Sequence, residues 1–126
     1  MGAFKIKKTA TGYVFHLAAG NGETIGTSEV YTTESACLKG TESVKSNAPV
    51  AKLEDQTVSE IVSVKNPKFE IYLDKAGQFR FRLKASNGEI ILASEGYTAK
   101  DSCKKGIESV RKNAPDAGIV KEIPTT

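Results

Sequence analysis

The sequence has few of the residue types on which most enzyme chemistry depends. It contains one histidine, two cysteines and no tryptophan. A nucleophilic hydrolase needs a base beside its nucleophile, and His16 cannot supply a duplicated one because Arg82 stands at the matching position of the second half. Acidic residues are scattered along turns and helix faces, so we expect no metal site and no cofactor. The sequence therefore favours a protein that is not an enzyme.

The chain also lacks long apolar segments and a strong charge of one sign. No apolar run approaches the roughly 20 residues that cross a bilayer. The N-terminal residues MGAFKIKK have no apolar core of the kind found in signal peptides. The formal net charge is +3, which is well short of the dense basic surface of a dedicated nucleic-acid binder. We expect a folded protein of the cytoplasm that makes no contact with membranes.

What the sequence does contain is an internal duplication. Residues 21–51 return 66 positions later as residues 87–117, and 18 of these 31 aligned positions are identical. A unit of about 60 residues is marginal for independent stability, so the two copies are expected to share one core. We predict a single domain, 1–126, made of repeat 1 (1–57), a connecting segment (58–65) and repeat 2 (66–126).

Each repeat begins with three predicted strands. In repeat 2 apolar residues recur at every second position over 69–73 and 79–84, and a third apolar segment follows at 90–93. Residues 74–77 supply the first turn. The second turn carries an Asn-Gly pair, the strongest short hairpin signal. This pair is Asn21-Gly22 in repeat 1 and Asn87-Gly88 in repeat 2.

After the third strand the apolar period changes to 3.6, which predicts a helix. Cys103, Gly106 and Val110 fall on one face of it, and Thr98 is placed to cap its first turn, as Thr32 is in repeat 1. A further apolar segment follows each helix, at 50–53 and 119–123. Each repeat therefore reads β-β-β-α-β.

Two residue types recur inside the predicted helices. Gly40 and Gly106 occupy helix interiors, where glycine costs roughly 1 kcal/mol relative to alanine. Because both repeats keep glycine there, we favour close approach of the helix to the sheet over approach of a ligand. Cys37 and Cys103 are also equivalent, and we expect two free, mostly buried thiols, with a disulfide or metal bridge as the alternative.

These motifs carry a family resemblance. A hairpin ending in NGE, a short strand leading to S-E-x-Y-T, a helix with x-x-G-x-x-S-V and a terminal N-x-P together resemble the YegP-like family of small bacterial proteins of unknown function. The resemblance covers both repeats. Its structural motif residues include Asn21, Gly22, Gly40, Asn87, Gly88 and Gly106.

The resemblance implies an architecture and no activity. The fold class is α+β: two tandem β-β-β-α-β repeats form one antiparallel sheet with helices packed on one face and with the last strands exchanged between the repeats. The tandem form is then expected to be a monomeric pseudo-dimer. The family supplies no catalytic residues to transfer to this chain.

The leading hypothesis for function is a small non-enzymatic binding or interaction module. One specific form is weak nucleic-acid binding through an open sheet face, because a sheet can hold single strands by stacking and by attraction to the backbone. The residues of this face are Tyr72, Arg80, Arg82 and Lys84. The matching strand of repeat 1 carries Val14, His16 and Ala18, so the face is not duplicated.

Two other hypotheses remain open. One is an enzyme or small-ligand binder that uses a groove between the two repeats, where Tyr31, Tyr97, Glu29 and Glu95 would converge by pseudo-symmetry. For the recurring acidic residues, including Glu23 and Glu89, we favour hydrogen bonding to the hairpin and helix start over acid-base work. The other hypothesis is association of identical chains through an uncovered edge strand.

Overall fold

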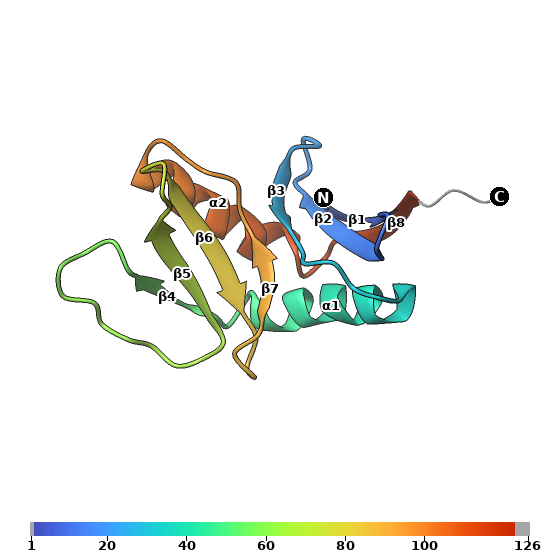
Figure 1. The fold of residues 1–126 in the computed structure, drawn as a ribbon, viewed down its shortest axis with the longest axis horizontal. Coiled ribbons are helices and arrows are strands. Elements are labelled where there is room, and N and C mark those ends of the chain that lie inside the picture. The colour runs from blue at the N-terminus through green and yellow to red at the C-terminus, as the bar shows by residue number, and fades with distance from the viewer. Residues whose placement is uncertain (1, 123–126) are drawn as a thin grey trace.

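The computed structural model describes residues 2–122, in which each repeat forms the predicted β-β-β-α-β unit (Figure 1). Repeat 1 contains β1 (Ala3–Lys8), β2 (Tyr13–Ala18), β3 (Thr24–Thr27), α1 (Glu34–Asn47) and β4 (Lys52–Asp55). Repeat 2 contains β5 (Lys68–Leu73), β6 (Phe79–Lys84), β7 (Ile90–Ala93), α2 (Lys100–Asn113) and β8 (Gly118–Glu122). The end of the last predicted apolar segment, residue 123, lies outside the described residues.

All eight strands belong to one sheet, in the order β4-β5-β6-β7-β3-β2-β1-β8. The two repeats meet in the middle at the antiparallel pair β3 and β7, where Thr27 lies opposite Ala93. At the edges, β4 of repeat 1 pairs with β5 of repeat 2, and β8 of repeat 2 pairs with β1 of repeat 1. The predicted exchange of last strands is therefore confirmed.

The pairing at both edges is parallel, so the sheet is mixed and not wholly antiparallel as predicted. The prediction holds for the six inner strands only. The physical reason is that neither edge strand is joined to its neighbour by a hairpin turn, the short connection that makes paired strands antiparallel; β4 and β8 each enter the sheet from a helix. Two parallel neighbours need a crossover of about a dozen residues or more, and residues 56–67 supply it between β4 and β5 with an irregular segment.

The helices cover one face of the sheet, as predicted. Alternate residues of the inner strands, such as Phe15 and Leu17 of β2 and Phe81 and Leu83 of β6, are fully buried under them. Each helix contacts both repeats: α1 packs on β2 and β7, and α2 packs on β6 and β3. The buried apolar residues of the two repeats consequently form one continuous core.

The helix caps differ from the prediction by one residue. The N-cap of α1 is Thr33 and not Thr32. Thr33 is extended (φ −130°, ψ 155°), and its hydroxyl accepts a hydrogen bond from the Ala36 N–H at 3.1 Å. In α2 the capping position is Ala99, which follows Thr98 and has no side-chain acceptor. The prediction of Thr32 and Thr98 as caps was wrong because in each repeat the N-cap is the next residue in the chain, directly before the helix. Only repeat 1 has threonine at that position.

The Asn-Gly turns form as predicted, and in each of them the glycine is the residue with positive φ. Gly22 and Gly88 have φ values of +88° and +85°, while no residue other than glycine has a positive φ within the described chain. The Gly22 N–H donates to the Ala19 carbonyl at 2.9 Å, as in a tight turn that ends in a left-handed residue. Asn21 and Asn87 instead stabilise the turn by accepting the N–H two residues ahead, each at 3.0 Å.

The helix glycines are confined by aromatic side chains. A Cβ atom at Gly40 would lie 2.5 Å from the hydroxyl oxygen of Tyr31 and 3.0 Å from the ring of Phe15. Gly106 is confined in the same way by Tyr97. The tyrosine ring fills the space between helix and sheet, so a packing role accounts for both glycines.

Both cysteines are free and fully buried, which confirms the prediction of buried thiols. Burial raises the pKa of the Cys103 thiol to about 11, and the negative charge of Asp55 adds to this. Burial likewise raises the pKa of Cys37. Because the thiolate is the reactive form, neither side chain is placed to act as a nucleophile.

Candidate functional site

The predicted basic strand lies on the face of the sheet that the helices leave uncovered. Arg82 donates from Nε to a carboxylate oxygen of Glu70 at 2.6 Å, and its guanidinium lies 4.5 Å from the centre of the Tyr72 ring. The Lys84 ammonium is 3.3 Å from the same carboxylate. Glu70 is only 2 % exposed, so these contacts replace the water that a charged carboxylate requires.

The remaining cation of this face is also paired. Arg80 donates from Nε to Asp74 at 2.7 Å, and the side chain of Asp74 also accepts the N–H groups of Ala76 and Gln78 in the turn between β5 and β6. All three predicted cations thus already contact a carboxylate. On the matching face of repeat 1, His16 hydrogen-bonds to Thr27 at 2.9 Å. Nucleic-acid binding through this face stays a prediction.

A second buried carboxylate, Glu54, lies next to Glu70 and was not identified from the sequence. It accepts hydrogen bonds from Gln56 (2.7 Å), Lys68 (2.9 Å) and the backbone N–H of Val64 (3.0 Å). The hydrogen bonds from Gln56 and Lys68 lower its pKa to about 2. No local pattern marks this residue, because its burial depends on the connecting segment that folds back over it.

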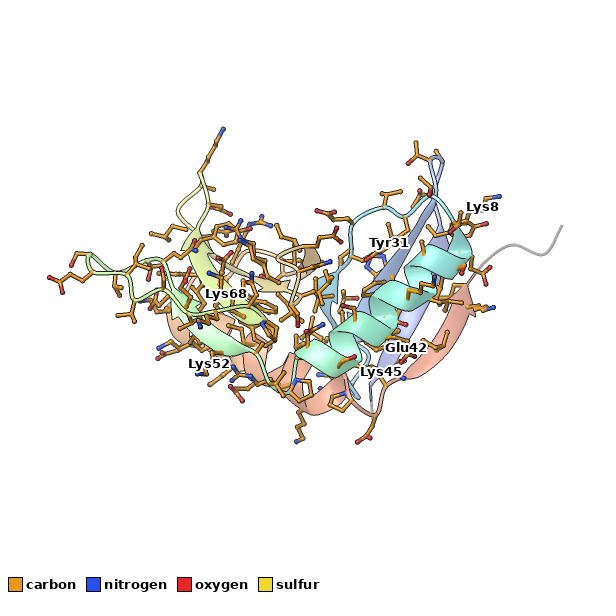
Figure 2. All side chains as sticks on the ribbon, turned by 90° about the horizontal axis from the view of Figure 1, so that it is seen from below. Lys8, Tyr31, Glu42, Lys45, Lys52 and Lys68 are labelled. Carbon is orange, nitrogen blue, oxygen red and sulfur yellow. The ribbon has the colours of Figure 1, made fainter. Side chains whose placement is uncertain are left out.

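A groove between the two repeats lies where α1 faces the turn between β6 and β7. Its volume is about 190 Å³. The residues that line it are Tyr31, Ala36, Lys39, Gly40, Ser43, Ala85, Asn87, Glu89 and Ile91. Figure 2 shows Tyr31 beside α1. Repeat 1 therefore supplies one wall of this groove and repeat 2 supplies the other.

The electrostatics of the groove also join the two repeats. Burial raises the pKa of the Tyr31 hydroxyl, and the charges of Cys37, Glu29 and Glu89 raise it further. Glu89 belongs to the other repeat. The pKa of Tyr97 is raised by burial and, among other charges, by Glu23. The same pairing of a tyrosine with a turn glutamate from the opposite repeat thus occurs twice.

The structure does not gather the four predicted residues into one site. Tyr31 packs on Gly40 of α1, and Tyr97 packs on Gly106 of α2, so each tyrosine belongs to a separate helix. The predicted hydrogen bonds to the recurring carboxylates, those of Glu23, Glu29, Glu89 and Glu95, are not found within residues 2–122; Glu23 and Glu89 use only their backbone groups in the turns. The carboxylate that faces the groove is instead that of Glu89, in the turn sequence NGE.

The residues that line the groove are almost all duplicated. Eight of the nine have the same residue type at the equivalent position of the other repeat, Ala36 being the exception because Ser102 replaces it. This fraction exceeds the 18 of 31 found for the repeat motif as a whole. The cations of the uncovered sheet face are not duplicated at all. The residues of the groove have thus diverged less between the two copies than the repeat motif as a whole.

The described part of the chain has neither a cluster of metal ligands nor a membrane-spanning helix. Within residues 2–122, no three histidine, cysteine, aspartate or glutamate side chains gather as metal ligands would. Neither of the two helices is long and apolar enough to cross a membrane. The candidate sites of the described chain are the surface grooves and the uncovered sheet face.

Comparison with known proteins matches both repeats to one family model, described as "Domain of unknown function (DUF1508)", at residues 9–55 and 74–120. A UPF0339 protein of Treponema denticola is 65% identical over 54 residues, which are 43% of this chain and 93% of that relative, so the unit also occurs singly. The UPF0339 protein YegP of Escherichia coli is 37% identical over 113 residues, 89% of each chain.

Solved structures show the same fold. The solution structure of yegP from E. coli, a protein of unknown function, superposes with a TM-score of 0.80 at 33% identity and covers 99% of this chain and 96% of its own. That of SO3888 from Shewanella oneidensis gives a TM-score of 0.79 at 31% identity, covering 97% and 92%. This chain belongs to the DUF1508 family, the YegP-like proteins of unknown function, in its tandem form.

Proposed function

We propose that this protein is a non-enzymatic binding module that takes a small polar ligand in the groove between α1 and the β6–β7 turn and in its pseudo-symmetric counterpart. The equivalent residues of the counterpart are Tyr97, Lys105 and Ser109, before and in α2, and Glu23, in the β2–β3 turn. The two copies of the repeat then provide two equivalent sites.

One observation supports this assignment above others: the groove keeps exposed polar residues in both copies. Gly40 and Ile91 are explained by packing, since both are buried. Packing does not explain Lys39 or Glu89, which are exposed and, within the described residues, have no ion-pair partner within 4.0 Å. Exposed residues that serve no fold contact and persist after duplication favour a role in binding.

The groove lining favours a zwitterionic ligand the size of an amino acid or dipeptide. An ammonium group (Lys39) and a carboxylate (Glu89) lie on opposite repeats and complement a ligand that carries both charges. The Tyr31 hydroxyl, whose pKa is raised, stays protonated at neutral pH and can donate a hydrogen bond. Catalysis is disfavoured because a tyrosine with a raised pKa is a poor general base and no histidine lines the groove.

The proposal is tested by amide NMR shifts of the ¹⁵N-labelled protein titrated with a panel of free amino acids and dipeptides. We expect two sets of shifted signals, at Tyr31, Lys39 and Glu89 and at their equivalents 66 residues later. Lys39→Gln should remove the first set and Lys105→Gln the second. Lys104→Gln is the matched control, because Lys104 is an exposed neighbour whose counterpart in repeat 1 is Leu38. Absence of shifts across the panel, or shifts that persist in both variants, would refute the assignment.

Three broader expectations are part of the same proposal and await their own tests. The protein should be a monomer, because the exchanged strands already close each repeat on the other. It should lie in the cytoplasm, where two unpaired thiols are stable. Weak nucleic-acid binding at Arg80, Arg82 and Lys84 should fall as salt rises, because phosphate contacts release counterions.

A further inference from the structure

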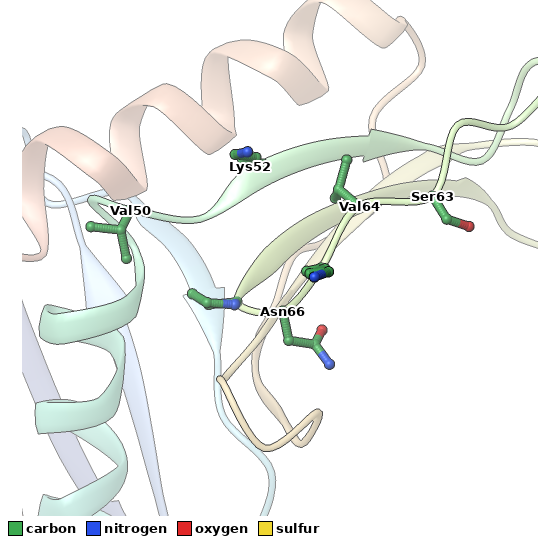
Figure 3. Close-up of a pocket in the computed structure, with 7 residues that line it drawn as sticks. Val50, Lys52, Ser63, Val64 and Asn66 are labelled. Carbon is green, nitrogen blue, oxygen red and sulfur yellow. The ribbon is translucent and has the colours of Figure 1, made fainter.

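A second, larger groove lies at the junction between repeat 1 and the connecting segment. Its volume is about 610 Å³. It is lined by Val50, Lys52, Ser63, Val64, Lys65, Asn66 and Pro67 (Figure 3). One wall is the chain that leaves α1 and enters β4, and the other is the end of the connecting segment before β5. None of these residues belongs to the duplicated groove.

The groove has an apolar side that nothing in the described chain covers. Val50 is 66% exposed although it lies beside the core residue Ala51, and Val64 and Pro67 face the same space. Single exposed apolar residues are common on protein surfaces. One exposed and two half-buried apolar residues in one concave surface of this volume are typical of a ligand site.

The charged residues of the groove are all cations. Lys52 and Lys65 line it, no acidic residue does, and neither lysine has a carboxylate within 4.0 Å among the described residues. Lys52 also lies directly opposite Lys68 in the sheet, and Lys68 lies opposite Lys84 (Figure 2 shows Lys52 and Lys68 together). Of the three lysines in this row, Lys68 and Lys84 contact buried carboxylates and Lys52 does not, so Lys52 is the cation of the row that is left without a counter-charge among the described residues.

The carboxylates nearest to this row are already neutralised. Glu54 contacts Lys68 at 2.9 Å, and Glu70 contacts Lys68 and Lys84 at 3.3 Å and Arg82 at 2.6 Å. Both carboxylates are buried, so they cannot turn toward Lys52 or Lys65. The groove therefore has an excess of positive charge that an anion can neutralise.

The groove is also held open by the fold. The Val64 N–H donates to the buried Glu54 carboxylate at 3.0 Å, which fixes the wall of the connecting segment in place. A site that is formed before the ligand arrives avoids the entropy loss of ordering a loop on binding. The positions equivalent to Val50 and Lys52 in repeat 2 are Asp116 and Gly118, so this groove has no duplicate.

From this geometry we propose that the groove binds an amphiphilic anion, a carboxylate with a medium-length aliphatic chain. The chain lies against Val50, Val64 and Pro67, and the carboxylate lies between the ammonium groups of Lys52 and Lys65. The chemistry is distinct from that of the duplicated groove, which carries both charges and no exposed apolar surface of this kind.

The test is an amide NMR titration of the ¹⁵N-labelled protein with butanoate, hexanoate and octanoate, with octylammonium as the probe of opposite charge. We expect shifts confined to the amide signals of residues 50–52 and 63–66. Affinity should rise about twofold or more for each added methylene, since burial of a methylene favours binding by up to about fourfold. Octylammonium should not shift these signals.

Matched variants separate charge from apolar contact. Lys52→Gln and Lys65→Gln should each weaken octanoate binding about two- to fivefold, as expected for a partly exposed ion pair, and Lys75→Gln, an exposed turn lysine outside the groove, should leave it unchanged. Val50→Ser should flatten the dependence on chain length. Equal binding of octanoate and octylammonium, equal binding of butanoate and octanoate, or shifts outside the groove would each overturn the proposal. Shifts with an oligonucleotide and none with octanoate would assign these lysines to nucleic acid instead.

Discussion

Replacing Gly106 by alanine tests the packing of helix on sheet directly. The added Cβ would lie 2.6 Å from the hydroxyl oxygen of Tyr97 and 2.9 Å from a ring carbon of Phe81. Phe81 is fully buried and the Tyr97 ring stacks on it with centroids 6.5 Å apart. Tyr97 is also fixed at its backbone by two hydrogen bonds with Phe79, of 2.8 and 2.7 Å. The ring therefore has little freedom to move away.

Two opposing terms set the size of the effect. Alanine is favoured over glycine in a helix interior by about 1 kcal/mol. Overpacking of a filled core destabilises by about 1–3 kcal/mol. The net loss for Gly106→Ala is expected to be about 1 kcal/mol, which for a domain of this size lowers the melting temperature by roughly 4 °C. Gly40→Ala should behave alike, because its Cβ would meet Tyr31 at 2.5 Å.

The assay is thermal unfolding followed by circular dichroism, with a second variant that removes the closest atom. Tyr97→Phe deletes the hydroxyl oxygen and leaves the ring, so Gly106→Ala should be less destabilising in that background by about 0.5 kcal/mol or more. Ser102→Ala, on the exposed side of α2, is the control. An unchanged or raised melting temperature for Gly106→Ala in the wild-type background would refute the packing explanation.

Two further predictions follow from single contacts. Ala99→Thr should stabilise the protein by about 1 kcal/mol, because it gives α2 the side-chain cap that Thr33 gives α1. Thr33→Ala should destabilise the protein by a similar amount, and urea unfolding measures both changes. Equal stability of the wild type and the two variants would contradict this prediction. The melting temperature should fall as the pH drops from about 5 toward 2. The pKa of Glu54 in the folded protein is about 2, below its ordinary value of 4.5. The charged carboxylate therefore stabilises the fold fully above pH 4.5, and this stabilisation is lost as the carboxylate is protonated at lower pH. Glu54→Gln should lower the melting temperature at pH 7 and flatten this fall, whereas Glu60→Gln, exposed in the connecting segment, should change neither.

Local structure could be predicted because its determinants lie close together in the chain. Alternation over 79–84 predicts a strand, and the 3.6 period through Cys103, Gly106 and Val110 predicts a helix face. The Asn-Gly turns follow from the tolerance of glycine for positive φ. The duplication further predicts a pseudo-symmetric molecule, and the family resemblance adds the exchange of last strands.

Only the tertiary structure decided which residues from distant segments lie together. The parallel pairing of β4 with β5 requires the crossover of residues 56–67, and the path of that segment buries Glu54, which in the sequence is one more charged residue. Arg82 stands on an exposed phase of its strand, yet it is neutralised because Glu70 lies opposite it. The groove between Tyr31 and Glu89 joins residues 58 positions apart. Periodicity in the sequence shows which face of a helix or strand is buried. Which residues lie across that face depends on how whole helices and strands pack against one another in the shared core.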